Sequence, residues 1–185
     1  VNLYLKVYDL SFKYFQRALT LCRRTSHYSL EARVLNNLGE VYRELKDYDK
    51  ALNYYQLSQT AHLKVNSPIH KSVAVSNIAG LYLEMEDYDN ASHYIDQAIL
   101  LAKDEENLMI ESACYHYAGI LARKKGRFEE SLTLLKKALE LHQSTMEMIH
   151  EAEVLIDILR VNGGCSPEQE CCERRDDREV FHDSL

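Results

Sequence analysis

Residues that make tight turns are scarce in this chain. Its 185 residues include six glycines, two prolines and no tryptophan. Because hairpin turns depend largely on glycine and proline, this scarcity argues against a fold built from many short strands. Long helices joined by short polar turns are therefore expected.

Long apolar runs and an excess of positive charge are lacking as well. No apolar stretch approaches the roughly 20 residues that a membrane-spanning helix needs, and no signal peptide is visible. The net charge of −7 argues against nucleic-acid binding, because phosphate contacts need a basic face. The first residue is Val1 and not Met, so we expect the numbering to begin inside a longer protein. A soluble, cytoplasmic protein that contacts neither membrane nor nucleic acid is predicted.

Catalytic and cofactor signatures are also missing. None of the eight histidines can be placed beside a suitable serine, cysteine or aspartate. There is no glycine-rich phosphate loop and no His-Glu-x-x-His spacing. We therefore expect a protein that is not an enzyme and that has no cofactor and no metal site.

What the sequence does contain is a repeat of forty residues. Leu38–Tyr42 (LGEVY) matches Ile78–Tyr82 (IAGLY), and Ala118–Ala122 (AGILA) follows after another forty residues. The register also extends backwards, since Tyr8 aligns with Tyr48, so the array begins in mid-repeat. Self-similarity at such a period predicts a solenoid of stacked units.

Each unit predicts two helices. Val34, Leu35 and Leu38 begin an i, i+3, i+4 pattern that is typical of one buried helical face. Asp47 and its repeat equivalent Asp87 can cap the second helix, because a short acceptor satisfies unpaired N–H groups there. Small residues at fixed positions would let the two helices approach closely: Gly39, Ala79 and Gly119 in the first helix, and Ala51, Ala91 and Ser131 in the second.

Tyrosine is abundant, with 13 residues. Most of the tyrosines recur at equivalent repeat positions, and we expect these to fill space between helices and not to stack on a ligand. They are Tyr8, Tyr14, Tyr42, Tyr48, Tyr54, Tyr82, Tyr88 and Tyr94. Cys22 and Cys114 fall at positions that we expect to be buried, as free thiols.

These units resemble the tetratricopeptide repeat family. The small–large signature of that family is carried by Leu35, Leu38, Gly39, Tyr42, Ala51, Tyr55 and Ser58 and by their equivalents forty and eighty residues later. The period is longer than the 34 residues of the standard motif. It resembles the long repeats of kinesin light chains, Pins-type adaptors and bacterial peptide-sensing regulators. The resemblance implies an all-α fold, a right-handed superhelix (α-solenoid) of antiparallel helix pairs.

The register divides the chain into segments. We expect a repeat array over residues 1–162, followed by an acidic tail over 163–185 that is disordered or folds with a partner. Zinc binding by Cys165, Cys171, Cys172 and His182 in the tail fits no familiar finger spacing. The segments of the array are a partial repeat over 1–27, repeats at about 28–67, 68–107 and 108–146, and a capping helix over 147–162.

The resemblance also implies a concave groove lined by the first helices. Asn37 and Asn77 share one repeat position, where the long-repeat families use asparagine to pair with a peptide backbone. Tyr117 interrupts this ladder. Replacing Gly80 by a bulky residue is expected to be a less informative test, because Ala79 holds the signature position. The carboxylate clamp of the chaperone-binding subclass does not match. The groove candidates are Asn37, Asn77, Arg33, Asn36, Glu40, Arg43, His116, Tyr117, Arg123 and Lys124.

The favoured interpretation is a non-enzymatic adaptor module that binds a peptide segment of a protein partner in this groove, as a monomer. Two alternatives remain. One is a regulatory sensor domain of a larger signalling protein, and the other is a structural scaffold that associates with itself through its groove or its ends.

Overall fold

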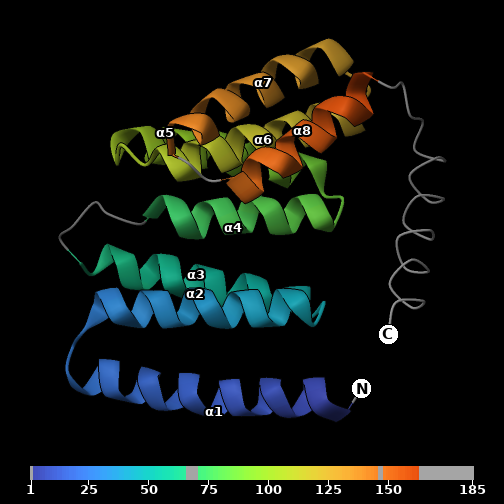
Figure 1. Ribbon diagram of the computed structural model, residues 1–185. Coiled ribbons are helices and arrows are strands. Elements are labelled where there is room, and N and C mark those ends of the chain that lie inside the picture. Colours follow the sequence, from blue (N-terminus) through green and yellow to red (C-terminus); the bar gives the residue numbers. More distant parts are fainter. Residues whose placement is uncertain (1, 66–70, 146–147, 163–185) are drawn as a thin grey trace.

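The computed structural model describes residues 2–65, 71–145 and 148–162, and every element in these ranges is an α-helix (Figure 1). The predicted tail over 163–185, with Cys165, Cys171, Cys172 and His182, lies outside the described residues. The helices are α1 (Asn2–Arg24), α2 (Tyr28–Glu44), α3 (Tyr48–Leu63), α4 (Lys71–Glu84), α5 (Tyr88–Asp104), α6 (Leu108–Lys124), α7 (Phe128–Thr145) and α8 (Met148–Asn162).

The helices stack as antiparallel pairs into one array, with α1 at one end and α7 and α8 at the other (Figure 1). The first helices of the pairs are α2, α4 and α6, and the second helices are α3, α5 and α7. By register α1 is a second helix and α8 is a first helix. The predicted all-α solenoid of antiparallel helix pairs is therefore confirmed.

The turns between helices follow the same register. One residue in each described turn has a positive φ: Ser26, Lys46, Glu86, Glu106 and Gly126, each separated from the next by twenty residues or a multiple of it. The predicted caps are also present, since the side chains of Asp47 and Asp87 accept hydrogen bonds from the backbone N–H groups of Lys50 (3.3 Å) and Asn90 (3.2 Å). These turns start the second helices α3 and α5.

Small residues hold the pairs together as predicted. A Cβ on Gly39 would lie 2.4 Å from the ring of Tyr55, and one on Gly119 would lie 2.7 Å from Leu135. Ala51, Ala91 and Ser131 are fully buried on the opposing helices. The close approach also brings side-chain hydroxyls within reach of the facing backbone, as in the 2.8 Å bond from Ser131 Oγ to the Gly119 carbonyl.

Most of the tyrosine prediction agrees with the packing. The rings of Tyr42 and Tyr54 stack at 5.2 Å, and those of Tyr82 and Tyr94 stack at 5.3 Å. Tyr14 differs, because its side chain is 62% exposed. Within the described residues no first helix precedes α1, so Tyr14 has no equivalent of Tyr42 on which to stack.

The last described helix packs on the unit before it. Val154 and Val161 of α8 pack against Tyr115 and Leu135. Leu159 of α8 is 68% exposed, at the repeat position that Gly39, Ala79 and Gly119 occupy in the first helices.

Cys22 and Cys114 are buried and free, as predicted. Across the described residues, no helix is long and apolar enough to cross a membrane.

Candidate functional site

Three of the side-chain contacts between successive first helices link residues that are 41 positions apart. They are Asn36–Asn77 and Arg43–Glu84 between α2 and α4, and His116–Asp157 between α6 and α8. The repeat period of forty places each residue beside the one that follows its own equivalent in the next unit. This offset decides which polar residues bind a neighbouring helix and which face solvent.

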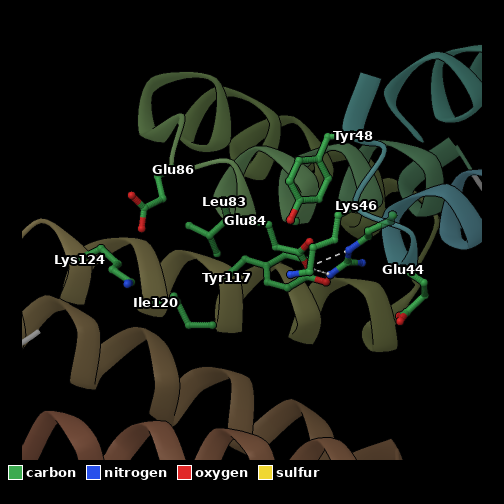
Figure 2. Close-up of a pocket in the computed structure, with 11 residues that line it drawn as sticks. Glu44, Lys46, Tyr48, Leu83, Glu84, Glu86, Tyr117, Ile120 and Lys124 are labelled. Atoms are coloured by element: carbon green, nitrogen blue, oxygen red, sulfur yellow. Dashed lines mark hydrogen bonds and ion pairs between the residues drawn. The ribbon is translucent and has the colours of Figure 1, made fainter. Parts of the chain in front are cut away.

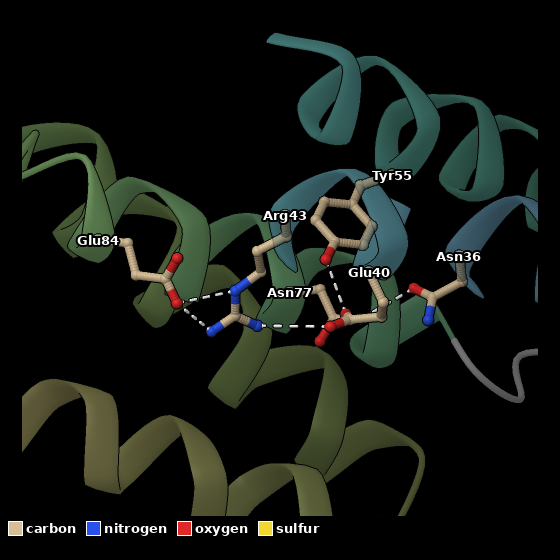
Figure 3. Close-up of polar contacts among 6 residues, drawn as sticks. All are labelled: Asn36, Glu40, Arg43, Tyr55, Asn77 and Glu84. Atoms are coloured by element: carbon tan, nitrogen blue, oxygen red, sulfur yellow. Dashed lines mark hydrogen bonds and ion pairs between the residues drawn. The ribbon is translucent and has the colours of Figure 1, made fainter. Parts of the chain in front are cut away.

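The Arg43–Glu84 contact between α2 and α4 belongs to a connected polar network with Glu40 and Tyr55, and the Asn36–Asn77 pair lies beside it (Figure 3). Arg43 Nε donates to Glu84 Oε1 at 2.8 Å, and a second guanidinium N–H group bonds to the same oxygen. Another guanidinium nitrogen lies 3.6 Å from Glu40 Oε2. The Tyr55 hydroxyl donates to Glu40 Oε1 at 2.7 Å, which ties the network to the packed interior.

The surroundings of Arg43 and Tyr55 fix their protonation states. Burial lowers the pKa of Arg43, but the hydrogen bond to Glu84 and the electrostatic attraction of Tyr117, Glu84 and Glu40 together outweigh burial, and the net shift is upward. Burial, together with the neighbouring Glu40 carboxylate, raises the pKa of Tyr55. Arg43 therefore stays cationic and Tyr55 stays a neutral hydrogen-bond donor at physiological pH. In this arrangement Arg43 already has two carboxylate partners within its own chain.

The two asparagines of the predicted ladder have different surroundings. Asn77 is half-buried, and its Nδ2 donates to Asn36 Oδ1 at 2.9 Å. Asn37 is exposed. A carboxamide has two donor hydrogens and an accepting oxygen, so Asn77 can hold Asn36 and still offer hydrogen bonds to a ligand.

Two of the predicted groove residues serve to hold α8. His116 is buried, and its Nε2 lies 2.7 Å from Asp157 Oδ2. Arg123 is largely buried, with a guanidinium nitrogen 3.9 Å from Asp157 Oδ1. We expected both to line an open groove; the neighbouring α8 covers them. The sequence predicted a capping helix but did not show which residues of α6 would bind it.

An open pocket of about 550 Å³ lies where the C-terminal halves of α2, α4 and α6 meet (Figure 2). Arg43, Tyr117 and Lys124 of the predicted set line it. The remaining lining residues are Glu44, Lys46, Tyr48, Gly80, Leu83, Glu84, Glu86 and Ile120. The lining thus combines an apolar centre with charged side chains of both signs.

A second pocket of about 450 Å³ lies near the start of the same face. Arg33, Asn36 and Asn37 line it, together with His62 and Val73. The ten predicted residues are therefore divided. Three line each pocket, Glu40 belongs to the network of Arg43, Asn77 bonds to Asn36, and His116 and Arg123 contact α8.

Gly80 lines the larger pocket and is not among the ten predicted groove residues. It lies in the interior of α4, where glycine costs about 0.5–1 kcal/mol relative to alanine. A Cβ there would lie 3.1 Å from Cζ and from the hydroxyl oxygen of Tyr117. The ring of Tyr117 from α6 therefore packs closely over Gly80.

The described residues contain no group of three or more His, Cys, Asp or Glu side chains that could hold a metal ion.

The sequence model of the tetratricopeptide repeat matches residues 1–62 and 72–144. The fold is an all-helical array of helix pairs, with polar contacts between successive first helices. The chain belongs to the tetratricopeptide repeat family.

Solved structures of other tetratricopeptide repeat proteins have the same fold as this chain. A search of curated protein sequences gave no significant match. Aspartyl phosphate phosphatase F from Bacillus subtilis is similar in structure, with a TM-score of 0.71, 14% identity, and coverage of 92% of this chain and 43% of that one. A putative kinesin light chain from Podospora anserina has a TM-score of 0.56 at 14% identity and covers 95% of both chains.

The TPR2AB domain of yeast Sti1, solved as a complex with pHSP90, gives a TM-score of 0.55 at 16% identity. The match covers 81% of this chain and 57% of that one. At these identities the similarity establishes the shared fold.

Proposed function

We propose that this protein is a non-enzymatic interaction module that binds an extended peptide segment of a partner protein along α2, α4 and α6. Tetratricopeptide repeats form a protein-interaction fold, and the structurally similar Sti1 domain is seen in complex with pHSP90. The observation that carries the proposal is the pair of open pockets on the face of the first helices. Both include exposed polar side chains, Arg33 and Asn37 in one pocket and Lys124 in the other.

The two pockets suggest a path for the peptide. Asn37 in one pocket and Asn77 between the two would pair with its backbone, because a carboxamide can both donate and accept. Arg33 at one end and Lys124 at the other would attract acidic side chains of the peptide, and the Tyr117 hydroxyl adds a further donor. Arg43 and Glu40 would position the neighbouring helices, since each already bonds within the network.

The test uses the 185-residue chain and a library of random 12-residue peptides displayed on phage. We expect enriched peptides to bind the chain in a fluorescence-polarisation assay. Replacing both Asn37 and Asn77 by Ala should weaken that binding by about tenfold, since two backbone hydrogen bonds are lost. The helical circular dichroism should be unchanged.

Asn53→Ala is the matched control. Asn53 is an exposed asparagine on α3 that lines neither pocket. Asn53→Ala should therefore retain the affinity. If the double variant binds as tightly as the original chain, the asparagine contacts are refuted; if no peptide is enriched, peptide binding itself is refuted.

A further inference from the structure

The α8 end of the array exposes a face that the other first helices bury. Leu155 is 44% exposed, at the repeat position of Leu35, Val75 and Tyr115. Those three equivalents are at most 7% exposed, because each packs in a core with the second helix of its own unit. Leu159, one turn further along α8, is exposed as well. Among the described residues no second helix covers α8, so this apolar face is open (Figure 1).

The α1 end exposes the complementary kind of face. Leu21 is 52% exposed, whereas its equivalent Ala61 is 4% exposed in a core with residues of α2. Tyr14 is exposed too, whereas its equivalent Tyr54 stacks on the ring of Tyr42 from the first helix of the same unit. Thus α1 is a second helix with an open first-helix face, and α8 is a first helix with an open second-helix face.

The two end helices also carry opposite charges. The sequence of α1 contains five basic residues and one acidic residue, whereas that of α8 contains three acidic residues and one basic residue. A contact between two α1 helices, or between two α8 helices, would bring like charges together, and such contacts are disfavoured. Charge complementarity therefore favours a contact between α1 and α8.

We propose that a second copy of this chain is the partner at these faces, and that α1 of one copy packs on α8 of another as the second helix of a shared unit. The repeat register then places Leu21 of one copy beside Leu155 of the other, as Ala61 and Leu35 share a core within one unit. Burial of these apolar side chains supplies the hydrophobic contribution. Because Leu159 is larger than the glycine of α2 at the same position, we expect a looser and weaker pairing than that of α2 with α3.

The contact joins two different faces, and this determines the form of the assembly. Each copy in a chain of contacts keeps both an α1 face and an α8 face, so the assembly grows beyond a dimer or closes into a ring. All the lining residues given above for the two pockets lie between Arg33 and Lys124, so the contact leaves them open. The proposal does not rest on the proposed function, and either one can fail without the other.

The first test is sedimentation velocity on the 185-residue chain over a wide range of concentrations. The average mass should rise with concentration and pass that of a dimer. Leu21→Glu places a carboxylate in the α1 face and Leu155→Glu places one in the α8 face, and each should weaken self-association by about tenfold or more, because contact would bury an unpaired charge. A chain that stays monomeric at every concentration would overturn the proposal.

Mixing the two variants separates this contact from contacts between identical faces. Leu21→Glu chains keep the α8 face and Leu155→Glu chains keep the α1 face, so an equimolar mixture should form a one-to-one complex that grows no further. Self-association of Leu21→Glu alone would mean that two α8 faces pair, and self-association of Leu155→Glu alone would mean that two α1 faces pair. Either result, or a mixture that forms no complex, contradicts the α1–α8 contact.

Leu100→Glu is the matched control, because it adds the same charge elsewhere. Leu100 is 66% exposed on α5, which lies at neither end of the array. This variant should associate like the original chain, and an equal loss of association would count against the contact. Circular dichroism checks that each variant folds. Tyr14→Glu and Leu159→Glu replace Leu21→Glu and Leu155→Glu if those unfold, since both of these side chains are still more exposed.

Discussion

The backbone at Gly126 shows how one residue sets the path of the chain. Gly126 has a φ of 75° in the turn before α7, and Lys46 and Glu86 have similar values at the equivalent turns. Residues with a Cβ are disfavoured in this conformation by about 1–2 kcal/mol. The backbone is therefore strained at the turns that contain Lys46 and Glu86, and glycine relieves this strain at the equivalent turn that contains Gly126.

Gly126→Ala should lower the free energy of unfolding by about 1 kcal/mol, because alanine must adopt the same positive φ. No other atom lies within 4 Å of the position where the new Cβ would be, so a steric clash does not contribute. Urea denaturation followed by circular dichroism measures the change. Lys46→Ala is the control and should have a smaller effect, since both residues carry a Cβ; equal losses would contradict the backbone explanation.

At the scale of single elements, the start of α4 is stabilised by a residue from a distant helix end. Glu105, just after α5, accepts hydrogen bonds from the backbone N–H groups of Lys71 (2.9 Å) and Ser72 (3.3 Å). It also accepts one from the Ser72 hydroxyl at 2.6 Å. A carboxylate at a helix N-terminus is favourable both as a hydrogen-bond acceptor and through the helix dipole. Glu105 thus links the end of one helix pair to its beginning.

Glu105→Ala should destabilise the fold by roughly 1–2 kcal/mol, because two backbone donors and one hydroxyl lose their acceptor. Hydrogen exchange gives the local readout, and the amides of Lys71 and Ser72 should exchange faster. Asp104→Ala removes an exposed carboxylate one residue earlier and should leave both amides protected. Equal exchange rates in the Glu105 variant and the original chain would rule out this cap.

At the scale of the whole molecule, the parts that could be predicted from the sequence are those that repeat. Gly39 and Gly119, the caps Asp47 and Asp87, and the helix pairs all recur every forty residues because each unit packs in the same way. A periodic signal of this kind can be recognised without knowing how neighbouring units are turned relative to one another.

The contacts between units could not be predicted, since they depend on that rotation. The bonds of Asn77 to Asn36 and of His116 to Asp157 join positions 41 apart. Asn36 and Asn37 are adjacent in the sequence, but Asn36 bonds to the next first helix and Asn37 faces solvent. The contact between Gly80 and Tyr117 was missed for the same reason, because it joins two units.

The closing helix α8 is held to the rest of the array by a buried carboxylate whose charge depends on pH. Asp157 faces His116 and Arg123 from α6 and Arg160 from its own helix. Burial raises the pKa of Asp157, but the hydrogen bond with His116 and the neighbouring cations outweigh burial and the net shift is downward. The folded state therefore favours the charged carboxylate more strongly than the unfolded state does.

A lowered pKa in the folded state contributes stability that is fully present above the unfolded value, about 3.9 for aspartate, and is lost as the pH falls through the lower folded value. Asp157→Asn should therefore cost roughly 1–3 kcal/mol at neutral pH, since it leaves the buried polar partners without their charged acceptor. The cost should shrink below about pH 4. Urea titrations between neutral and acidic pH measure this difference, with the exposed Glu153→Gln on the same helix as control. A cost that does not change with pH would contradict a charged Asp157 as the group that holds α8 in place.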